Sequence, residues 1–105
     1  MARFDVYVNT GSHASTTPYL LDVQSDLLAG LDSRMVVPLR HLAQFPKVKL
    51  PFQLMPVFNI EGVDCLMETP KMGAVPQRIL KLPVLSLAAS HDQITAALDF
   101  LFQGY

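Results

Sequence analysis

Three histidines, His13, His41 and His91, are the side chains of this sequence best suited to hold a metal ion. They lie in a predicted loop, in a predicted connection and at the start of a predicted helix, and their spacings match no zinc signature. Two acids, Asp22 and Asp26, are close enough in the chain to suggest a carboxylate pair. A strand that runs into a loop more often presents such acids to solvent or to backbone amides, so we interpret Asp26 as a turn-capping residue.

The other groups that could support catalysis are equally isolated. The only cysteine, Cys65, lies within an apolar run, which predicts a small buried side chain rather than a reactive thiol. A lone cysteine excludes an internal disulfide and is consistent with a reducing compartment. The 5 glycines are too few and too dispersed for a phosphate-binding loop. We therefore expect no catalytic residue, no metal site and no cofactor, and we predict a binding protein rather than an enzyme.

Length and composition limit the function further. A chain of 105 residues is expected to form one domain, residues 1–105, with a single core. Its hydrophobic share of 50% is at the upper edge for a globular domain, so apolar surface is expected to remain for a partner, most simply in a symmetric homodimer. The net charge is -1 and the 8 lysines and arginines are scattered, which argues against autonomous binding of nucleic acid.

The sequence also predicts where the protein acts. The first five residues include Asp5, where a signal peptide would need an apolar run, and no stretch reaches the length of a transmembrane helix. We therefore expect a cytoplasmic protein without a membrane partner.

Period-2 alternation predicts the first strand, with Phe4, Val6 and Val8 facing a core. Residues 9–18 are rich in Gly, Ser and Thr and predict an exposed, mobile loop. Further extended segments are predicted at residues 19–23, 34–39, 54–60, 63–67, 77–82 and 84–87.

Turn residues predict how these strands are connected. A loop is centred on residues 30–32, and Pro38 indicates that the strand at 34–39 ends there or lies at a sheet edge. Residues 40–51 predict a long connection with one helical turn at 41–44. Residues 61–62 join two apolar runs as a hairpin, and Gly73 and Pro76 indicate another turn.

The period changes to that of a helix only near the end of the chain. Ser90 is a predicted N-cap that forms a capping box with Gln93, and Gly104 is placed where a helix stops. One apolar stripe is predicted to face the core, formed by Ile94, Ala97, Leu98, Leu101 and Phe102. Phe100 lies off this stripe, and a dimer contact or a flank of the sheet would explain it equally well.

Short strands followed by one helix predict a mainly β fold, a β-rich α+β domain in which a small antiparallel partial barrel carries a C-terminal α-helix over one opening. Four methionines, Met35, Met55, Met67 and Met72, are interpreted as core residues that fill gaps between strands.

Four segments carry a resemblance to a known family: residues 21–26, 34–39, 67–76 and 102–105. Together they resemble the CcdB family of bacterial gyrase-poisoning toxins, over nearly the whole chain from Phe4 to Tyr105. The resemblance implies an SH3-like barrel and a homodimer that binds the A subunit of DNA gyrase and traps the covalent gyrase–DNA intermediate. It also implies a CcdA-like antitoxin that neutralises the toxin, and repression of their shared operon by the toxin–antitoxin complex, the only form expected to bind operator DNA.

The resemblance also implies a binding site. Matched by motif, the gyrase-binding positions are Ser25, Leu27, Leu28, Asp99, Gln103, Gly104 and Tyr105. The best-known family ending is Trp-Gly-Ile, and Asp99 replaces a frequent Asn. Gln103 stands where that ending has Trp, and the absence of the tryptophan indole predicts a gyrase contact that is weaker, differently specific or absent.

Antitoxin contacts are implied in parts of residues 11–17 and 41–49, which are the segments least similar to the family. Because partner specificity depends on such divergent segments, neutralisation by another system's antitoxin is not expected. Two alternatives stay open. One is an endoribonuclease toxin with the same barrel, which would need a basic RNA groove with an arginine that acts beside an acid or a hydroxyl acceptor. The other is a non-toxic chromosomal homologue that retains only antitoxin binding.

Overall fold

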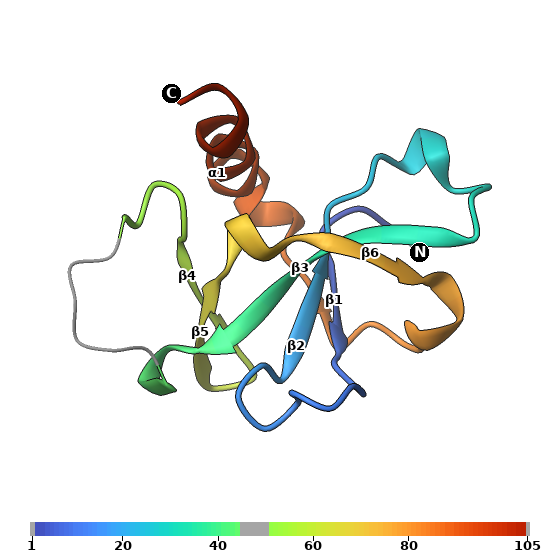
Figure 1. Ribbon diagram of the computed structural model, residues 1–105, viewed down its shortest axis with the longest axis horizontal. Helices are drawn as coiled ribbons and strands as arrows, with labels where there is room; N and C mark the ends of the chain where they lie inside the picture. Colours follow the sequence, from blue (N-terminus) through green and yellow to red (C-terminus); the bar gives the residue numbers. More distant parts are fainter. Residues whose placement is uncertain (1, 45–50, 105) are drawn as a thin grey trace.

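The computed structural model describes residues 2–44 and 51–104 (Figure 1). Its strands and its α-helix are β1 (Asp5–Val8), β2 (Tyr19–Asp22), β3 (Ser33–His41), β4 (Val57–Ile60), β5 (Val63–Met67), β6 (Gly73–Pro76), β7 (Leu85–Ser86) and α1 (His91–Gln103). Short 3-10 turns connect them: η1 (Asp26–Leu28), η2 (Leu42–Gln44), η3 (Thr69–Lys71), η4 (Gln77–Ile79) and η5 (Ala88–Ser90). The predicted β-rich α+β fold with one C-terminal helix is confirmed.

The described strands form one antiparallel sheet that curls into a nearly closed barrel. The strand order is β4-β5-β3-β2-β1-β7, and β6 also pairs with β3. The long strand β3 is central: one edge pairs with β2, while the other pairs with β6 over residues 33–36 and with β5 over residues 39–41.

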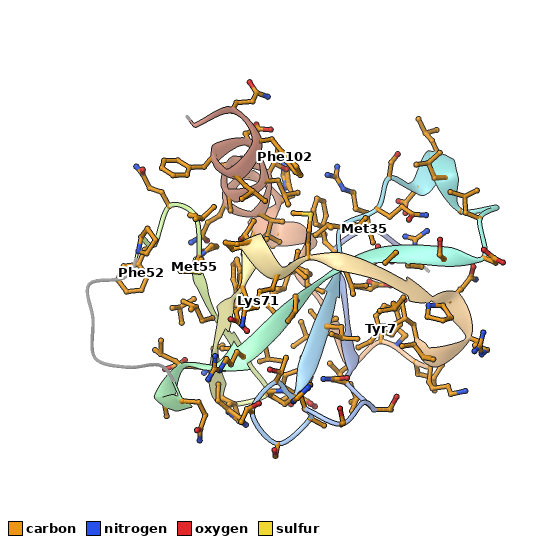
Figure 2. The ribbon with its side chains drawn as sticks, in the orientation of Figure 1. Tyr7, Met35, Phe52, Met55, Lys71 and Phe102 are labelled. Carbon is orange, nitrogen blue, oxygen red and sulfur yellow. The ribbon has the colours of Figure 1, made fainter. Side chains whose placement is uncertain are left out.

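Each face of the sheet carries a cluster of buried side chains, and neighbouring residues of one strand contribute to different clusters because consecutive side chains point to opposite faces. Val6 belongs to the larger cluster, which includes Ile94 and Ala97 of α1. Tyr7, labelled in Figure 2, belongs to a second cluster with Leu80. The predicted alternation is therefore only partly correct: the Val8 side chain, predicted to face the core, is 50% exposed, whereas the neighbouring Tyr7 side chain is 1% exposed.

Several strand boundaries differ from the predictions. Phe4 has a φ of 75°, so β1 begins one residue later than predicted. Residues 54–56 belong to a turn in which the N–H groups of Leu54 and Met55 donate to the Pro51 carbonyl, so β4 begins only at Val57.

Three further predictions, on residues 73–76, on residues 77–79 and on Pro38, were wrong. Residues 73–76 form the strand β6 instead of a turn, since they pair with residues 33–36. Residues 77–79 form η4 instead of a strand. Pro38 lies inside β3 and does not end it: its carbonyl accepts from the Glu68 N–H just past the end of β5, and its missing N–H would point to that same gap between β5 and β6.

Other local predictions are confirmed. Glu61 and Gly62 form the β4–β5 hairpin turn, with φ values of 52° and 87° that suit a type I′ turn. β7 (Leu85–Ser86) lies within the predicted extended segment 84–87, although Leu87, with a φ of -100° and a ψ of 21°, is not extended. η2 lies within the predicted helical turn. The remainder of the predicted connection, residues 45–50, lies outside the described residues.

The helix boundaries match the prediction, although the capping box does not form. Ser90 occupies the N-cap position, but its side chain makes no capping hydrogen bond, because η5 leads directly into α1. At the other end Gly104 adopts the left-handed conformation, with a φ of 80°, and its N–H donates to the Phe100 carbonyl. Phe102 is 72% exposed, so its predicted place on the buried stripe is wrong.

The methionine prediction holds in part. Met67 is fully buried, and Met55 and Met72 are half-buried. Met35 is 37% exposed at the start of β3 and does not fill the core.

Candidate functional site

The loop after β2 exposes apolar side chains on a short, well-bonded turn. Ser25 caps η1: its Oγ accepts from the Leu27 N–H at 3.2 Å. The side chains that follow are largely exposed, Leu27 at 95% and Leu28 at 50%, and Leu31 just beyond η1 is 51% exposed. No residue of η1 itself is buried. This loop therefore presents apolar area that is available to a partner protein.

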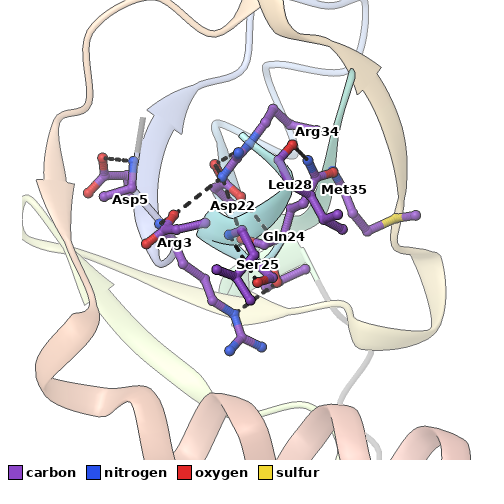
Figure 3. A network of polar contacts seen from close by, with 12 residues as sticks. Arg3, Asp5, Asp22, Gln24, Ser25, Leu28, Arg34 and Met35 are labelled. Carbon is purple, nitrogen blue, oxygen red and sulfur yellow. Dashed lines mark hydrogen bonds and ion pairs between the residues drawn. The ribbon is translucent and has the colours of Figure 1, made fainter. Parts of the chain in front are cut away.

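A buried ion pair lies beneath this loop and joins β2 to β3 (Figure 3). Arg34 Nη2 lies 2.7 Å from Asp22 Oδ2, and Arg34 Nε donates to the same oxygen at 2.9 Å. Both residues are at most 1% exposed. Burial raises the pKa of the Asp22 carboxyl, and the Arg34 hydrogen bond together with the Gln24 N–H opposes that shift. Of the two environments expected for Asp22, solvent or a backbone amide, the structure shows the second: Asp22 is buried and its Oδ1 accepts from the Gln24 N–H at 3.0 Å. The ion pair with Arg34 was not predicted.

Asp26 occupies the outer edge of the same network. Its Oδ1 accepts from the Arg3 N–H at 2.8 Å and lies 3.9 Å from Arg34 Nη2, while its side chain remains 62% exposed. Arg3 also reaches across the loop, since its Nε donates to the Val23 carbonyl at 3.0 Å. Asp22 and Asp26 therefore serve the loop structure.

The second group of site residues lies at the C-terminal end of α1. Asp99, Gln103 and Gly104 are all exposed, and Tyr105 lies outside the described residues. The exposed ring of Phe102 adds apolar area beside them, on the last turns of α1 (Figure 2). Phe102 follows Ile94 by eight residues and therefore lies at the margin of the apolar stripe. This marginal position is the sequence signal from which its exposure could have been predicted.

Phe100 lines a groove between α1 and the segment that leads to β4. The groove has a volume of about 710 Å³ and is lined by Phe52, Gln53, Gln93, Ala96, Phe100 and Gly104. Phe100 is half-buried there, off the face that carries Ile94 and Ala97.

Within one chain, the two groups of site residues do not meet. Figure 1 shows η1 and the C-terminal end of α1 on the same side of the molecule but well apart. Each group is thus a separate projection from one protomer.

Comparison with known protein families identifies the family of the chain. The family model described as CcdB protein matches residues 3–104. The chain belongs to the CcdB family. Members of this family are gyrase-poisoning toxins of toxin–antitoxin systems and not catalytic enzymes.

The two segments that the CcdB resemblance assigns to the antitoxin are adjacent in space. The His41 N–H donates to the Thr16 carbonyl at 2.9 Å, which joins the first loop to the end of β3. Residues 45–49 of the second segment lie outside the described residues. In Figure 1 this surface lies at the end of the molecule opposite η1 and the end of α1.

A polar cavity of about 440 Å³ opens beside the first loop. Its lining includes His13, Arg40, Glu68 and Lys71. The Glu68 side chain is 8% exposed, and its Oε2 lies 3.9 Å from Arg40 Nη1 and 3.7 Å from Lys71 Nζ. This CcdB-family chain thus places an arginine beside an acid at one surface cavity.

The groups considered for metal binding and nucleophilic chemistry are dispersed in the described structure. Among residues 2–44 and 51–104, no three His, Cys, Asp or Glu side chains lie close enough to hold a metal ion. Cys65 is fully buried, as predicted, and burial raises the pKa of its thiol to about 11. In the same part of the chain, no helix is long and apolar enough to cross a bilayer.

Proposed function

We propose that this chain is the toxin of a toxin–antitoxin system, and that it binds the A subunit of DNA gyrase and traps the gyrase–DNA cleavage complex. The observation that supports the proposal is the exposure of large apolar side chains at the positions for which the resemblance to CcdB toxins implies gyrase binding, and beside them. Leu27 and Leu28 at these positions, and Phe102 directly before Gln103, are between half and almost fully exposed. Exposed apolar side chains of this size are typical centres of a protein–protein interface.

The proposed binding residues form two projections. Ser25, Leu27 and Leu28 form the first, on η1 and its cap. Asp99, Gln103 and Gly104 form the second, at the end of α1, and Tyr105, which follows them in the sequence, is proposed to bind gyrase with them. A homodimer would present both projections twice, which suits a target that is itself two-fold symmetric.

The partners and the location follow from the same proposal. A CcdA-like antitoxin binds the surface that includes residues 11–17 and 41–44, and the toxin–antitoxin complex represses its own operon. Gyrase acts on DNA in the bacterial cytoplasm, so the toxin acts there.

Truncation tests the second projection. Deleting residues 103–105 is expected to abolish stabilised cleavage products when the protein is incubated with gyrase and DNA. Among the described residues that the deletion removes, Gln103 and Gly104 are exposed, so the circular dichroism spectrum should stay native. Poisoning by the truncated chain as strong as by the full chain would contradict the proposed site.

A second candidate function rests on the cavity that contains Arg40, Glu68 and Lys71. An arginine beside a carboxylate is an arrangement that metal-independent RNA cleavage needs. Incubation with RNA in the absence of gyrase separates the two candidates, because cleavage there would favour the endoribonuclease. A non-toxic homologue that retains only antitoxin binding would be harmless when expressed without antitoxin in a gyrase-sensitive host.

A further inference from the structure

The exposed η1 turn has little packing to hold it in place. None of its residues is buried, and a single 3-10 turn has little stability of its own. Its position must therefore come from polar contacts with the rest of the protein.

Gln24 makes two of these contacts with one side chain (Figure 3). Its Oε1 accepts from the Met35 N–H of β3 at 3.0 Å, and its Nε2 donates to the Leu28 carbonyl of η1 at 3.2 Å. The partners determine the orientation of the amide, since a backbone N–H can only donate and a carbonyl can only accept.

The backbone of Gln24 is attached to the buried ion pair. Its N–H donates to Asp22 Oδ1 at 3.0 Å, and Asp22 is in turn bound to Arg34. A continuous set of contacts thus leads from the fully buried Asp22 through Gln24 to Leu28, whose side chain is half exposed.

We propose that Gln24 is a positioning residue for the binding surface: its amide ties η1 to β3 and holds Leu27 and Leu28 in the orientation that binds the gyrase A subunit. The second part of this inference, that Leu27 and Leu28 bind the gyrase A subunit, rests on the proposed function. Gln24 itself need not touch the partner.

Two substitutions separate the contacts. Gln24→Glu retains an acceptor for the Met35 N–H but has no donor for the Leu28 carbonyl. Gln24→Met keeps a similar length and volume, removes both hydrogen bonds and adds no charge next to Asp22 and Asp26. The matched control is Gln93→Glu, the same change at an exposed position in the first turns of α1.

The first measurement is amide hydrogen exchange in the free protein. The N–H groups of Ala29 and Leu31 donate within the loop, to the Asp26 and Leu28 carbonyls. We expect their exchange to accelerate about tenfold in both Gln24 variants, the effect of losing one ordinary hydrogen bond. In the Gln24 variants, exchange of the β4–β5 hairpin amides should stay unchanged. In the Gln93→Glu control, exchange of the Ala29 and Leu31 amides should also stay unchanged. Unaltered exchange at Ala29 and Leu31 would overturn the proposal, whatever gyrase does.

The second measurement is the dissociation constant for the gyrase A subunit. We expect it to rise about tenfold in both Gln24 variants, with melting temperatures close to wild type and antitoxin affinity unchanged. Faster exchange with unaltered gyrase affinity would overturn the link to binding. A wild-type protein that does not bind gyrase would overturn the proposed function, while the exchange result would still decide whether Gln24 holds η1.

Discussion

At the scale of single residues, exposure separates the side chains that serve a partner from those that serve the fold. Leu27 is 95% exposed and contributes almost nothing to the core, whereas Cys65 is fully buried in it. A substitution at Leu27 should therefore change binding without changing stability, and a substitution at Cys65 should do the opposite.

Leu27→Ala tests the first expectation. Truncating a leucine that becomes buried on binding should weaken gyrase affinity on the order of tenfold or more, because its buried apolar area is lost. The free energy of unfolding should stay within about 0.5 kcal/mol of wild type. Leu82→Ala is the matched control, since Leu82 is 83% exposed and lies outside both projections. Equal losses of affinity in the two variants would argue against a specific site at η1.

Burial of Cys65 should make the free energy of unfolding depend on pH in the alkaline range. Its thiol pKa is raised from 9.0 to about 11, so its stabilising contribution is complete below pH 9 and is lost as the pH rises through about 11. Between pH 8 and about pH 11, wild type should lose about 2 kcal/mol more unfolding free energy than Cys65→Ala does. Urea denaturation of both proteins across this range measures it, and parallel pH profiles would contradict it.

At the scale of elements, the ion pair between Asp22 and Arg34 connects β2, β3 and the η1 loop. Both side chains are almost completely removed from solvent, and Arg34 Nη1 has no hydrogen-bond acceptor among the described residues. Removing one partner of such a pair leaves the other charge buried and uncompensated, which costs more than removing both.

A double-mutant cycle measures this coupling. Arg34→Met should lower the free energy of unfolding by about 3 kcal/mol, because it leaves the Asp22 carboxylate in the core. Adding Asp22→Asn to that variant should restore part of the loss, since no buried charge remains. Additive losses in the double variant, measured by denaturant unfolding, would show that the pair does not act as a unit.

At the scale of the whole molecule, the placement of surfaces matters more than any one contact. The segments proposed for the antitoxin lie at one end of the folded molecule, and both projections proposed for gyrase lie toward the opposite end (Figure 1). Because the two projections are apart within one protomer, a two-fold assembly is the simplest way to present a composite surface to a symmetric target.

Analytical ultracentrifugation tests the assembly. We expect a sedimenting species with twice the mass of the 11.6 kDa chain at micromolar concentration. Dilution that dissociates it should reduce gyrase poisoning in parallel, because a single protomer offers only half of the composite surface. A monomer that poisons gyrase at full strength would contradict the homodimer.

Short-range chemistry of the sequence was sufficient for part of this structure. The α1 boundaries follow from apolar spacing and from Gly104, and the β4–β5 turn follows from Gly62, because these features depend on neighbours a few residues away. The apolar setting of Cys65 likewise predicted its burial. The resemblance to CcdB toxins, which the family match confirms, depended on motifs within continuous segments.

Only the tertiary structure decided the features that depend on distant segments. Residues 73–76 became a strand because residues 33–36 pair with them, and Pro38 is tolerated in the centre of the sheet because its missing N–H meets the gap between β5 and β6. Asp22 is buried because Arg34 reaches it from the next strand. Burial and pairing are properties of the assembled sheet, so single-segment patterns contain no signal for them.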